Sequence, residues 1–412
     1  MDAPVCRICL DTGEEELISP CAGCRGSSAC VHYSCIARFY MSRATFWELH
    51  CPTCKHTYEG KAAVDLGNLG LEQLELIHGQ DSNSPEVAAV LTNLANAYWN
   101  IGDVNRMKDL LERALGINEA VYGPNHHEVA FTLTNLGTAY GDLGDAVRMK
   151  ELLERAVAIK ETVYGPDHRE VASALANLGI AYGDLGDDVR KRELLERALA
   201  IEEAAYGPDH REVANTLTNL GNAIGNLGDP GRKRDLLERA LAIEEATYGA
   251  EHRELAATLA NLGSAYGDLG DAGRMKELLE RALAIEEAAY GLEHSELVFT
   301  LTNLGVANAA LGEWADAEDM SARALRIAGA SFPSPSLIKA EVSLYLAAVR
   351  RALQADTSRA IWEEAELELQ AAVGEDHARV KLHVVVQNVV FFWKGVGRAD
   401  VAQWLLQASN AP

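Results

Sequence analysis

The sequence lacks cysteine over most of its length. No residue from 55 to 412 is a cysteine, and all eight cysteines lie between Cys6 and Cys54. It also lacks any apolar run long enough to cross a bilayer, so we expect no membrane span. The chain does not open on the basic and then apolar pattern of a signal peptide. These absences favour a reducing compartment, the cytoplasm or alternatively the nucleus, and argue against disulfides.

Signatures of common enzymes and of nucleic-acid binders are absent as well. The sequence has no phosphate-binding loop, no His-Glu-x-x-His motif and no arrangement typical of a catalytic triad. The formal net charge is -24 and the pI is about 4.9, which argues against nucleic acid as a partner. We interpret the acid excess as a feature that keeps a long helical surface in solution.

The cysteines are spaced as metal ligands. Three Cys-x-x-Cys pairs and one His-x-x-Cys pair fall between residues 6 and 54. At this spacing a short turn presents two ligand atoms to one tetrahedral zinc, and eight ligands make two sites without an open position. We therefore expect two structural zinc ions, with Cys30 as a spare thiol that could replace a neighbouring ligand. The expected ligands are Cys6, Cys9, Cys21, Cys24, His32, Cys35, Cys51 and Cys54.

Most of the remaining chain is an internal repeat. A Tyr-Gly pair recurs every 42 residues, from Tyr122-Gly123 to Tyr290-Gly291. Within each unit the apolar residues follow helical spacing twice, with a Gly-Asp break between the two stretches. Each unit is therefore predicted to be a pair of antiparallel helices, and a period of this length is typical of a solenoid. The expected fold class is mainly α, an α-solenoid with a small N-terminal zinc finger.

The repeat pattern resembles the tetratricopeptide (TPR) repeat, on Leu133-x2-Leu136-Gly137-x2-Tyr140 with Leu153 and Ala156 later. The long period resembles the repeats of kinesin light chains. TPRs usually have a small residue early in the second helix, and most units of this chain depart from that pattern. We expect the departure to loosen the packing between the two helices of a unit. Only Ala317 keeps the small residue, and the other units have Met107, Met149, Lys191, Lys233 and Met275.

Four segments follow from these patterns. Residues 1–59 are the zinc finger, and 60–85 are a linker with a short helix over 66–77. Residues 86–330 hold six repeats. Residues 331–412 are interpreted as degenerate repeats and a C-terminal cap, since the end of a solenoid faces water on one side.

The order of the zinc ligands resembles the RING-CH (RING-variant) fingers of MARCH-type ubiquitin ligases. Seven residues separate Cys24 from His32, as in that family. The resemblance implies a cross-brace, in which one zinc takes Cys6, Cys9, His32 and Cys35 and the other takes Cys21, Cys24, Cys51 and Cys54. PHD fingers share the ligand order, but they usually have a tryptophan two positions before the seventh ligand, where this chain has Leu49.

The same resemblance implies a docking surface for a ubiquitin-conjugating enzyme. By position, Ile8, Phe39 and Pro52 match its apolar patch, and Lys55 stands where an arginine often touches ubiquitin. Lysine offers a point charge there rather than a bidentate fork. Local core packing is the alternative interpretation of Ile8 and Phe39.

Two polar columns recur in the repeats. An asparagine precedes the first-helix leucine of each unit, a position that in TPR arrays lines the concave groove, where an amide can hold an extended peptide. Recent duplication of the repeats is an equally good explanation. These residues are Asn93, Asn135, Asn177, Asn219, Asn261 and Asn303. A histidine column, His126 to His294, is expected to cap loops, because successive members lie too far apart to share a metal.

The functional hypothesis is a ubiquitin ligase without a covalent intermediate. The finger would hold the conjugating enzyme, and the TPR groove would hold a protein or peptide substrate. One alternative is a non-enzymatic scaffold with a structural zinc finger, and another is a PHD-like reader of histone tails.

Overall fold

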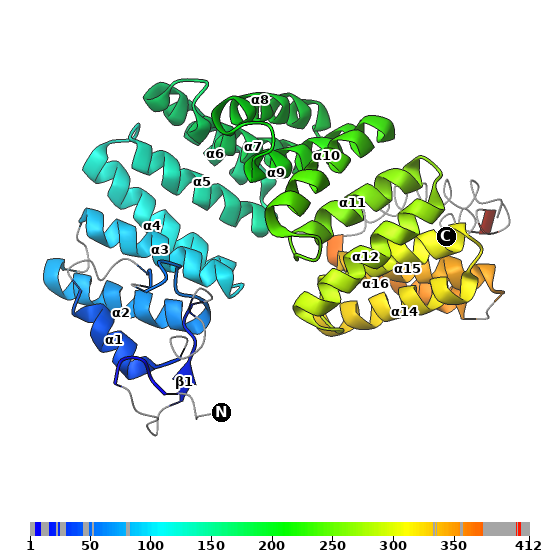
Figure 1. Cartoon of the computed structure of the whole chain (residues 1–412), viewed down its shortest axis with the longest axis horizontal. Helices are drawn as coiled ribbons and strands as arrows, with labels where there is room; N and C mark the ends of the chain where they lie inside the picture. Colours follow the sequence, from blue (N-terminus) through cyan, green and yellow to red (C-terminus); the bar gives the residue numbers. More distant parts are fainter. Residues whose placement is uncertain are drawn as a thin grey trace. The chain divides into compact units, whose positions relative to one another are not determined.

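The computed structural model describes residues 5–9, 16–21, 24, 30–43, 49–51, 53–79, 83–332, 334, 336–354, 357–373, 401, 403 and 404. The chain divides into two compact units, Met1–Ala205 and Tyr206–Pro412 (Figure 1). The described part is a mainly helical, TPR-like solenoid of 16 helices preceded by a cysteine- and histidine-rich region, which confirms the predicted fold class. Within it, no helix combines the length and apolar character needed to cross a membrane.

The described residues of the N-terminal region form two short strands and one helix. Strands β1 (Leu17–Ile18) and β2 (Val31–His32) pair antiparallel, with Leu17 opposite His32. Helix α1 (Tyr33–Met41) follows directly, and its apolar face buries Ile36 and Tyr40. A single bridge joins His50 to Thr57. With so few backbone pairs, this region depends on its side chains for its form.

Helix α2 (Gly60–His78) joins the finger to the solenoid, and it begins six residues before the short helix predicted at 66–77. Its buried Val64 and Leu66 belong to the same apolar core as the finger cysteines and Tyr58. A Cβ on Gly67 would lie 2.7 Å from Leu94 Cδ1, so only glycine lets α2 approach α3 so closely. The segment expected to be a linker therefore packs on both neighbours.

The repeats form helical hairpins. In the first unit the helices are α3 (Pro85–Asn100), α4 (Val104–Tyr122), α5 (His127–Asp142), α6 (Ala146–Tyr164), α7 (Arg169–Asp184) and α8 (Asp188–Tyr206). In the second they are α9 (Arg211–Asn226), α10 (Pro230–Tyr248), α11 (Leu255–Asp268), α12 (Ala272–Tyr290), α13 (Leu297–Ala310), α14 (Trp314–Ser331), α15 (Leu337–Ala352) and α16 (Ser358–Val373). The predicted pairs are confirmed. The possible repeat around Asn388 lies outside the described residues.

The packing within each hairpin corrects the expectation of loosened repeats. In four of the five units whose second helix has a long side chain instead of a small one, the facing first helix has a glycine; the unit of Met107 has Trp99 at that position instead. A Cβ on Gly141 would lie 2.7 Å from Met149 Sδ, and one on Gly183 would lie 2.6 Å from Lys191 Cδ. Gly225 faces Lys233 and Gly267 faces Met275 in the same way. In these hairpins the larger side chain is on the second helix and the glycine on the first helix makes room for it, so the helices still pack closely.

The histidine column, expected from sequence to cap loops, accepts hydrogen bonds at the ends of loops where the first helices begin. His126 Nδ1 accepts a hydrogen bond from the Glu128 backbone N–H at 3.3 Å, which satisfies one free donor at the start of α5. Its ring stacks on Tyr122 with centroids 4.6 Å apart. The same cap recurs at His168 and His210. His252 and His294 accept the equivalent hydrogen bond, but from Glu254 and Glu296, which are themselves the N-cap residues of α11 and α13.

Polar side chains are buried where successive repeats meet. Asn118 Nδ2 donates to Thr132 Oγ1 at 2.9 Å in the first unit. In the second unit the equivalent residue is a glutamate, and Thr258 Oγ1 donates to Glu244 at 3.0 Å, as Thr300 does to Glu286. The other carboxyl oxygen of each glutamate has no hydrogen-bond partner among the described residues. Burial raises the pKa of both carboxyls to about 7.

Candidate metal centre and docking surface

The expected zinc ligands gather into two separate tetrads. The first contains Cys6, Cys9, His32 and Cys35, and the second contains Cys21, Cys24, Cys51 and Cys54. In each tetrad all four ligand atoms lie within 4.8 Å of one another. The grouping agrees with the cross-brace that the family resemblance implied.

The spacing of the ligand atoms fits a tetrahedral zinc. Sulfurs bonded at about 2.3 Å to one tetrahedral ion stand roughly 3.8 Å apart. In the second tetrad the Cys21 and Cys54 sulfurs are 3.6 Å apart, and those of Cys24 and Cys51 are 3.7 Å apart. In the first, His32 Nδ1 lies 3.3 Å from Cys9 Sγ and 3.9 Å from Cys35 Sγ. The two tetrads are therefore consistent with two zinc ions.

The ligands are held by elements from both ends of the finger. His32 ends β2 and Cys35 lies in the first turn of α1, so the strand-to-helix junction places two ligands of the first tetrad. Cys51 is fixed by its backbone N–H, which donates to the His56 carbonyl at 2.8 Å. The ligand pairs of the two sites alternate along the chain. Each site therefore joins two ligand pairs that have a pair of the other site between them in sequence.

Cys30 lies outside both tetrads. It is half-buried, and its carbonyl accepts a hydrogen bond from the Arg7 backbone N–H at 3.1 Å. The two tetrads therefore consist of His32 and seven cysteines. Cys30 does not replace a ligand in this arrangement.

The thiols differ in how readily they lose a proton. Burial raises the pKa of Cys6 and Cys51, but hydrogen bonds from backbone N–H groups outweigh it and lower each pKa to about 6. Burial also raises the pKa of Cys21 and Cys24. The neighbouring thiols add to the effect of burial at Cys21, whereas at Cys24 hydrogen bonds with Arg7 and Cys21 oppose it. Four adjacent thiolates repel one another, so a divalent ion would supply the charge that this cluster needs.

Arg7 contacts the tetrad to which it is not adjacent in sequence. It stands between two ligands of the first site, yet its guanidinium donates to Cys24 Sγ at 2.8 Å and to Cys51 Sγ at 3.4 Å, both in the second. A four-thiolate zinc site has a net charge of about -2, which one guanidinium partly neutralises. Sequence reasoning missed this role, because the separations in the chain are 17 and 44 residues.

The predicted docking residues are only partly described. Ile8 and Phe39 are 40% and 38% exposed, so neither is buried in the local core. Lys55 is exposed, and its φ of 65° fixes the turn just after the last ligand. Pro52 lies outside the described residues. A docking role for these residues stays a prediction.

The asparagine column lies on the first helix of each hairpin. In the first unit Asn93, Asn135 and Asn177 are half-buried, as are Asn219, Asn261 and Asn303 in the second. Asn135 Nδ2 is buried and has no hydrogen-bond partner among the described residues. Peptide binding by the column stays a prediction.

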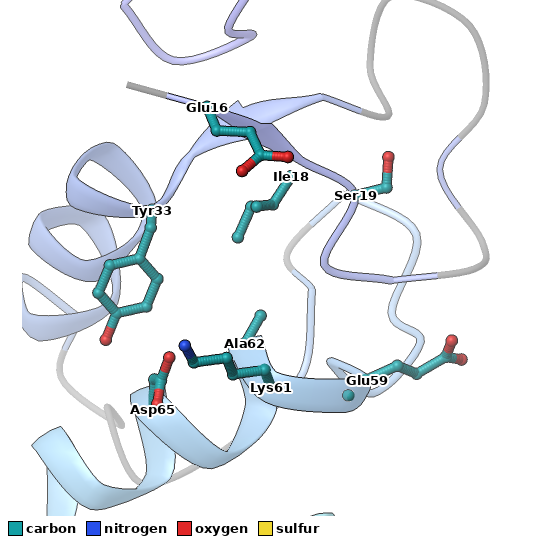
Figure 2. A pocket seen from close by; sticks show the side chains of 9 residues that line it. Glu16, Ile18, Ser19, Tyr33, Glu59, Lys61, Ala62 and Asp65 are labelled. Carbon is teal, nitrogen blue, oxygen red and sulfur yellow. The ribbon is translucent and has the colours of Figure 1, made fainter. Parts of the chain in front are cut away.

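A cleft of about 700 Å³ opens between the finger and α2 (Figure 2). Glu16, Ile18 and Ser19 line it from the β1 segment, and Tyr33 lines it from the start of α1. The first turns of α2 close it with Glu59, Gly60, Lys61, Ala62 and Asp65. Sequence patterns did not indicate the cleft, because three segments that are distant in the chain meet there only after folding.

Comparisons with known proteins agree with these two regions. A RING-variant domain model matches residues 6–54. Tetratricopeptide-repeat models match residues 86–149 and 270–330 in one case and 129–170, 171–212 and 213–254 in another. The finger match favours the RING-variant family over PHD fingers. No curated protein matches the sequence.

Solved structures give the same view of the helices. The TPR-like repeats of a putative kinesin light chain from Podosopora anserina are 27% identical, cover 51% of this chain and 99% of that chain, and give a TM-score of 0.43. The apo form of RapI is 15% identical over 84% of this chain and 91% of that chain, with a TM-score of 0.58. The quorum sensor NprR from B. thuringiensis is 13% identical over 85% and 97%, with a TM-score of 0.57. The last two indicate the fold alone.

Proposed function

We propose that this chain, a RING-variant domain followed by tetratricopeptide repeats that resemble those of kinesin light chains, is a ubiquitin-protein ligase. The finger holds a ubiquitin-conjugating enzyme, and the repeats hold the protein to be modified. The observation that supports this most directly is the pair of closed tetrads within a RING-variant sequence.

Zinc has a structural part in this proposal. Cys6, Cys9, His32 and Cys35 would hold one ion, and Cys21, Cys24, Cys51 and Cys54 would hold the other. Each ion cross-links segments that share few hydrogen bonds. With four protein ligands and no open position, neither ion activates water or substrate.

Catalysis then depends on positioning. Ile8 and Phe39 are exposed apolar groups beside the two zinc loops, and Pro52 and Lys55 follow in the second loop. Together they would hold the conjugating enzyme so that its ubiquitin thioester stands in a reactive pose. Desolvation of the apolar side chains would supply affinity, and the Lys55 charge would contact ubiquitin.

The repeats supply the second binding surface. TPR arrays bind proteins, and in this chain each first helix presents a half-buried asparagine at one position. A primary amide pairs with a peptide backbone through one donor and one acceptor, so the column suits an extended segment of substrate. Asn135, whose amide nitrogen has no partner among the described residues, is the first position to substitute.

The proposal is tested by discharge of ubiquitin from a panel of charged conjugating enzymes onto free lysine. We expect the wild type to accelerate discharge with at least one enzyme, and Ile8→Ala with Phe39→Ala to abolish the acceleration while both zincs stay bound. Leu76→Ala is the matched control, because Leu76 is 81% exposed on α2 and outside the docking patch. No acceleration with any enzyme would sink the proposal.

One observation favours a second candidate, a non-enzymatic scaffold. The finger shares its core with α2 and with Leu94 and Ala97 of α3, so the finger also covers the first end of the solenoid. A scaffold predicts that Ile8→Ala and Phe39→Ala leave partner binding and cellular function unchanged, whereas zinc removal exposes the end of the array.

A further inference from the structure

The lysines are distributed unevenly over this chain. The sequence has 11 lysines against 26 arginines. Nine of the lysines fall within the described residues, and only Lys55 and Lys61 among those nine are exposed. Both lie next to the finger.

Every described lysine of the repeats is covered or engaged. Lys160 and Lys233 are buried, with 5% and 8% of their surface exposed. Lys276 Nζ bonds Glu313 at 2.5 Å, and Lys339 Nζ lies 3.5 Å from Glu368. Lys108, Lys150 and Lys191 are half-buried, against Asp109, the Tyr182 ring and Gly183 respectively.

The exposed cations of the described repeats are arginines, among them Arg106, Arg148, Arg190, Arg232 and Arg274. A second set of arginines is half-buried and tied to loops: Arg155 Nη2 donates to the Pro124 carbonyl at 3.0 Å, and the same contact recurs at Arg197, Arg239, Arg281 and Arg323. A guanidinium stays protonated and does not accept ubiquitin, whereas a lysine amine does. The exposed cations of the described repeats are therefore side chains that ubiquitin transfer cannot modify.

Lys61 has the opposite surroundings. It is the second residue of α2 and lies at the rim of the cleft in Figure 2, where its side chain and that of Asp65 point toward the same edge as the Tyr33 hydroxyl. Burial raises the pKa of Tyr33, and the nearby Asp65 carboxylate adds to it. Within the described residues Lys61 has no ion-pair partner at salt-bridge distance, so its amine is free to react.

We propose that Lys61 is the residue on which this protein modifies itself with ubiquitin, an inference that rests on the proposed ligase function. The reaction is aminolysis of the ubiquitin thioester on the conjugating enzyme. The Lys61 ammonium first gives one proton to solvent, and the amine then attacks the thioester carbonyl. An amide C–N bond forms, the C–S bond breaks, and the departing cysteine thiolate takes the second proton.

Lys55 is the other exposed lysine, but it serves a different purpose in this scheme. It follows the last zinc ligand directly, and in the proposed complex it faces ubiquitin and the conjugating enzyme. A docked enzyme would cover it. Lys61 lies six residues further, on a helix whose buried face is part of the finger core, so it stays close to the finger and outside the docking patch.

The test uses the full-length zinc-loaded protein with a charged conjugating enzyme. We compare wild type, Lys61→Arg and Lys276→Arg, and map ubiquitin by mass spectrometry on all lysines, including Lys381 and Lys394 outside the described residues. We expect Lys61→Arg to lose most self-modification while discharge onto free lysine stays at the wild-type rate. Lys276→Arg, the matched control on α12, should change neither.

The outcomes separate this inference from the function on which it rests. Self-modification that persists in Lys61→Arg, or that maps chiefly to the repeats or to Lys381 and Lys394, overturns the inference and leaves the ligase proposal intact. Absence of discharge onto free lysine with every conjugating enzyme overturns both.

Discussion

The finger and the repeats obtain their structure by different means. The described residues of the finger form two strands of two residues each and one helix of nine, and we infer that its ligands define its form. The repeats have helices of 14 to 19 residues whose apolar faces recur every 42 residues. In the finger the sequence specifies two sites of four ligands each. In the repeats it specifies apolar helix faces that pack on one another. A perturbation should therefore have very different effects in the two regions.

Removal of zinc should give the largest contrast. Structural zinc contributes on the order of 10–16 kcal/mol in small finger peptides, so chelation should unfold the finger. The repeats have no metal ligands of this kind among the described residues and should keep their helical circular dichroism. Native mass spectrometry should find two zincs in the wild type and at most one in Cys51→Ser. A single zinc in the wild type would contradict the two-site geometry.

Much of this contrast could be predicted from sequence. The ligand set and the helix pairs are periodic or closely spaced, so they could be identified locally. The contact of Arg7 with Cys24 and Cys51 could not, because it depends on how two loops cross. The glycine opposite Met149 was missed for a related reason, since a helix pattern describes one face at a time. The beginning of α2 at Gly60 depended on the finger core, which supplies the partner for Val64.

Within the repeats we expect an intermediate effect on stability, because a large side chain on one helix packs over a glycine on the facing helix. Met149→Ala should destabilise the array by about 2–5 kcal/mol, because it empties the space over Gly141. Adding Gly141→Ala should recover about 1 kcal/mol or more, since alanine partly fills that space and favours helix. The natural precedent is the buried pair Ala309 and Ala317. Urea unfolding of the two single variants and the double variant measures the coupling energy between the two positions. Strictly additive changes in the free energy of unfolding would contradict the idea that the two residues share one space.

The smallest expected effect is a pH dependence that belongs to the second unit. The pKa values of Glu244 and Glu286 are raised to about 7 by burial, so the folded state binds more protons than the unfolded state above their ordinary value of 4.5. Stability from these groups is therefore greatest at low pH and decreases as pH rises through about 7. At about 1.4 kcal/mol per pKa unit, the change should be at most about 3 kcal/mol for each group.

Replacing both glutamates by glutamine should remove this slope. The double variant should match the wild type near pH 5 and exceed it near pH 8 in thermal unfolding, because a neutral amide has no charge to bury. Glu251→Gln, at an exposed position of the same unit, is the control and should keep the wild-type slope. An unchanged slope in the double variant would show that other groups cause the dependence.

Helix α2 has a mechanical consequence. Because Val64 and Leu66 lie in the finger core while Gly67 sits against Leu94 of α3, no joint separates the finger from the first hairpin. In the proposed complex, a protein bound to the first compact unit would be held at a fixed distance from the ubiquitin thioester. Its effective concentration at the thioester would then depend on that fixed geometry rather than on the motion of a flexible linker. The shape of the target would then determine which of its lysines come within reach.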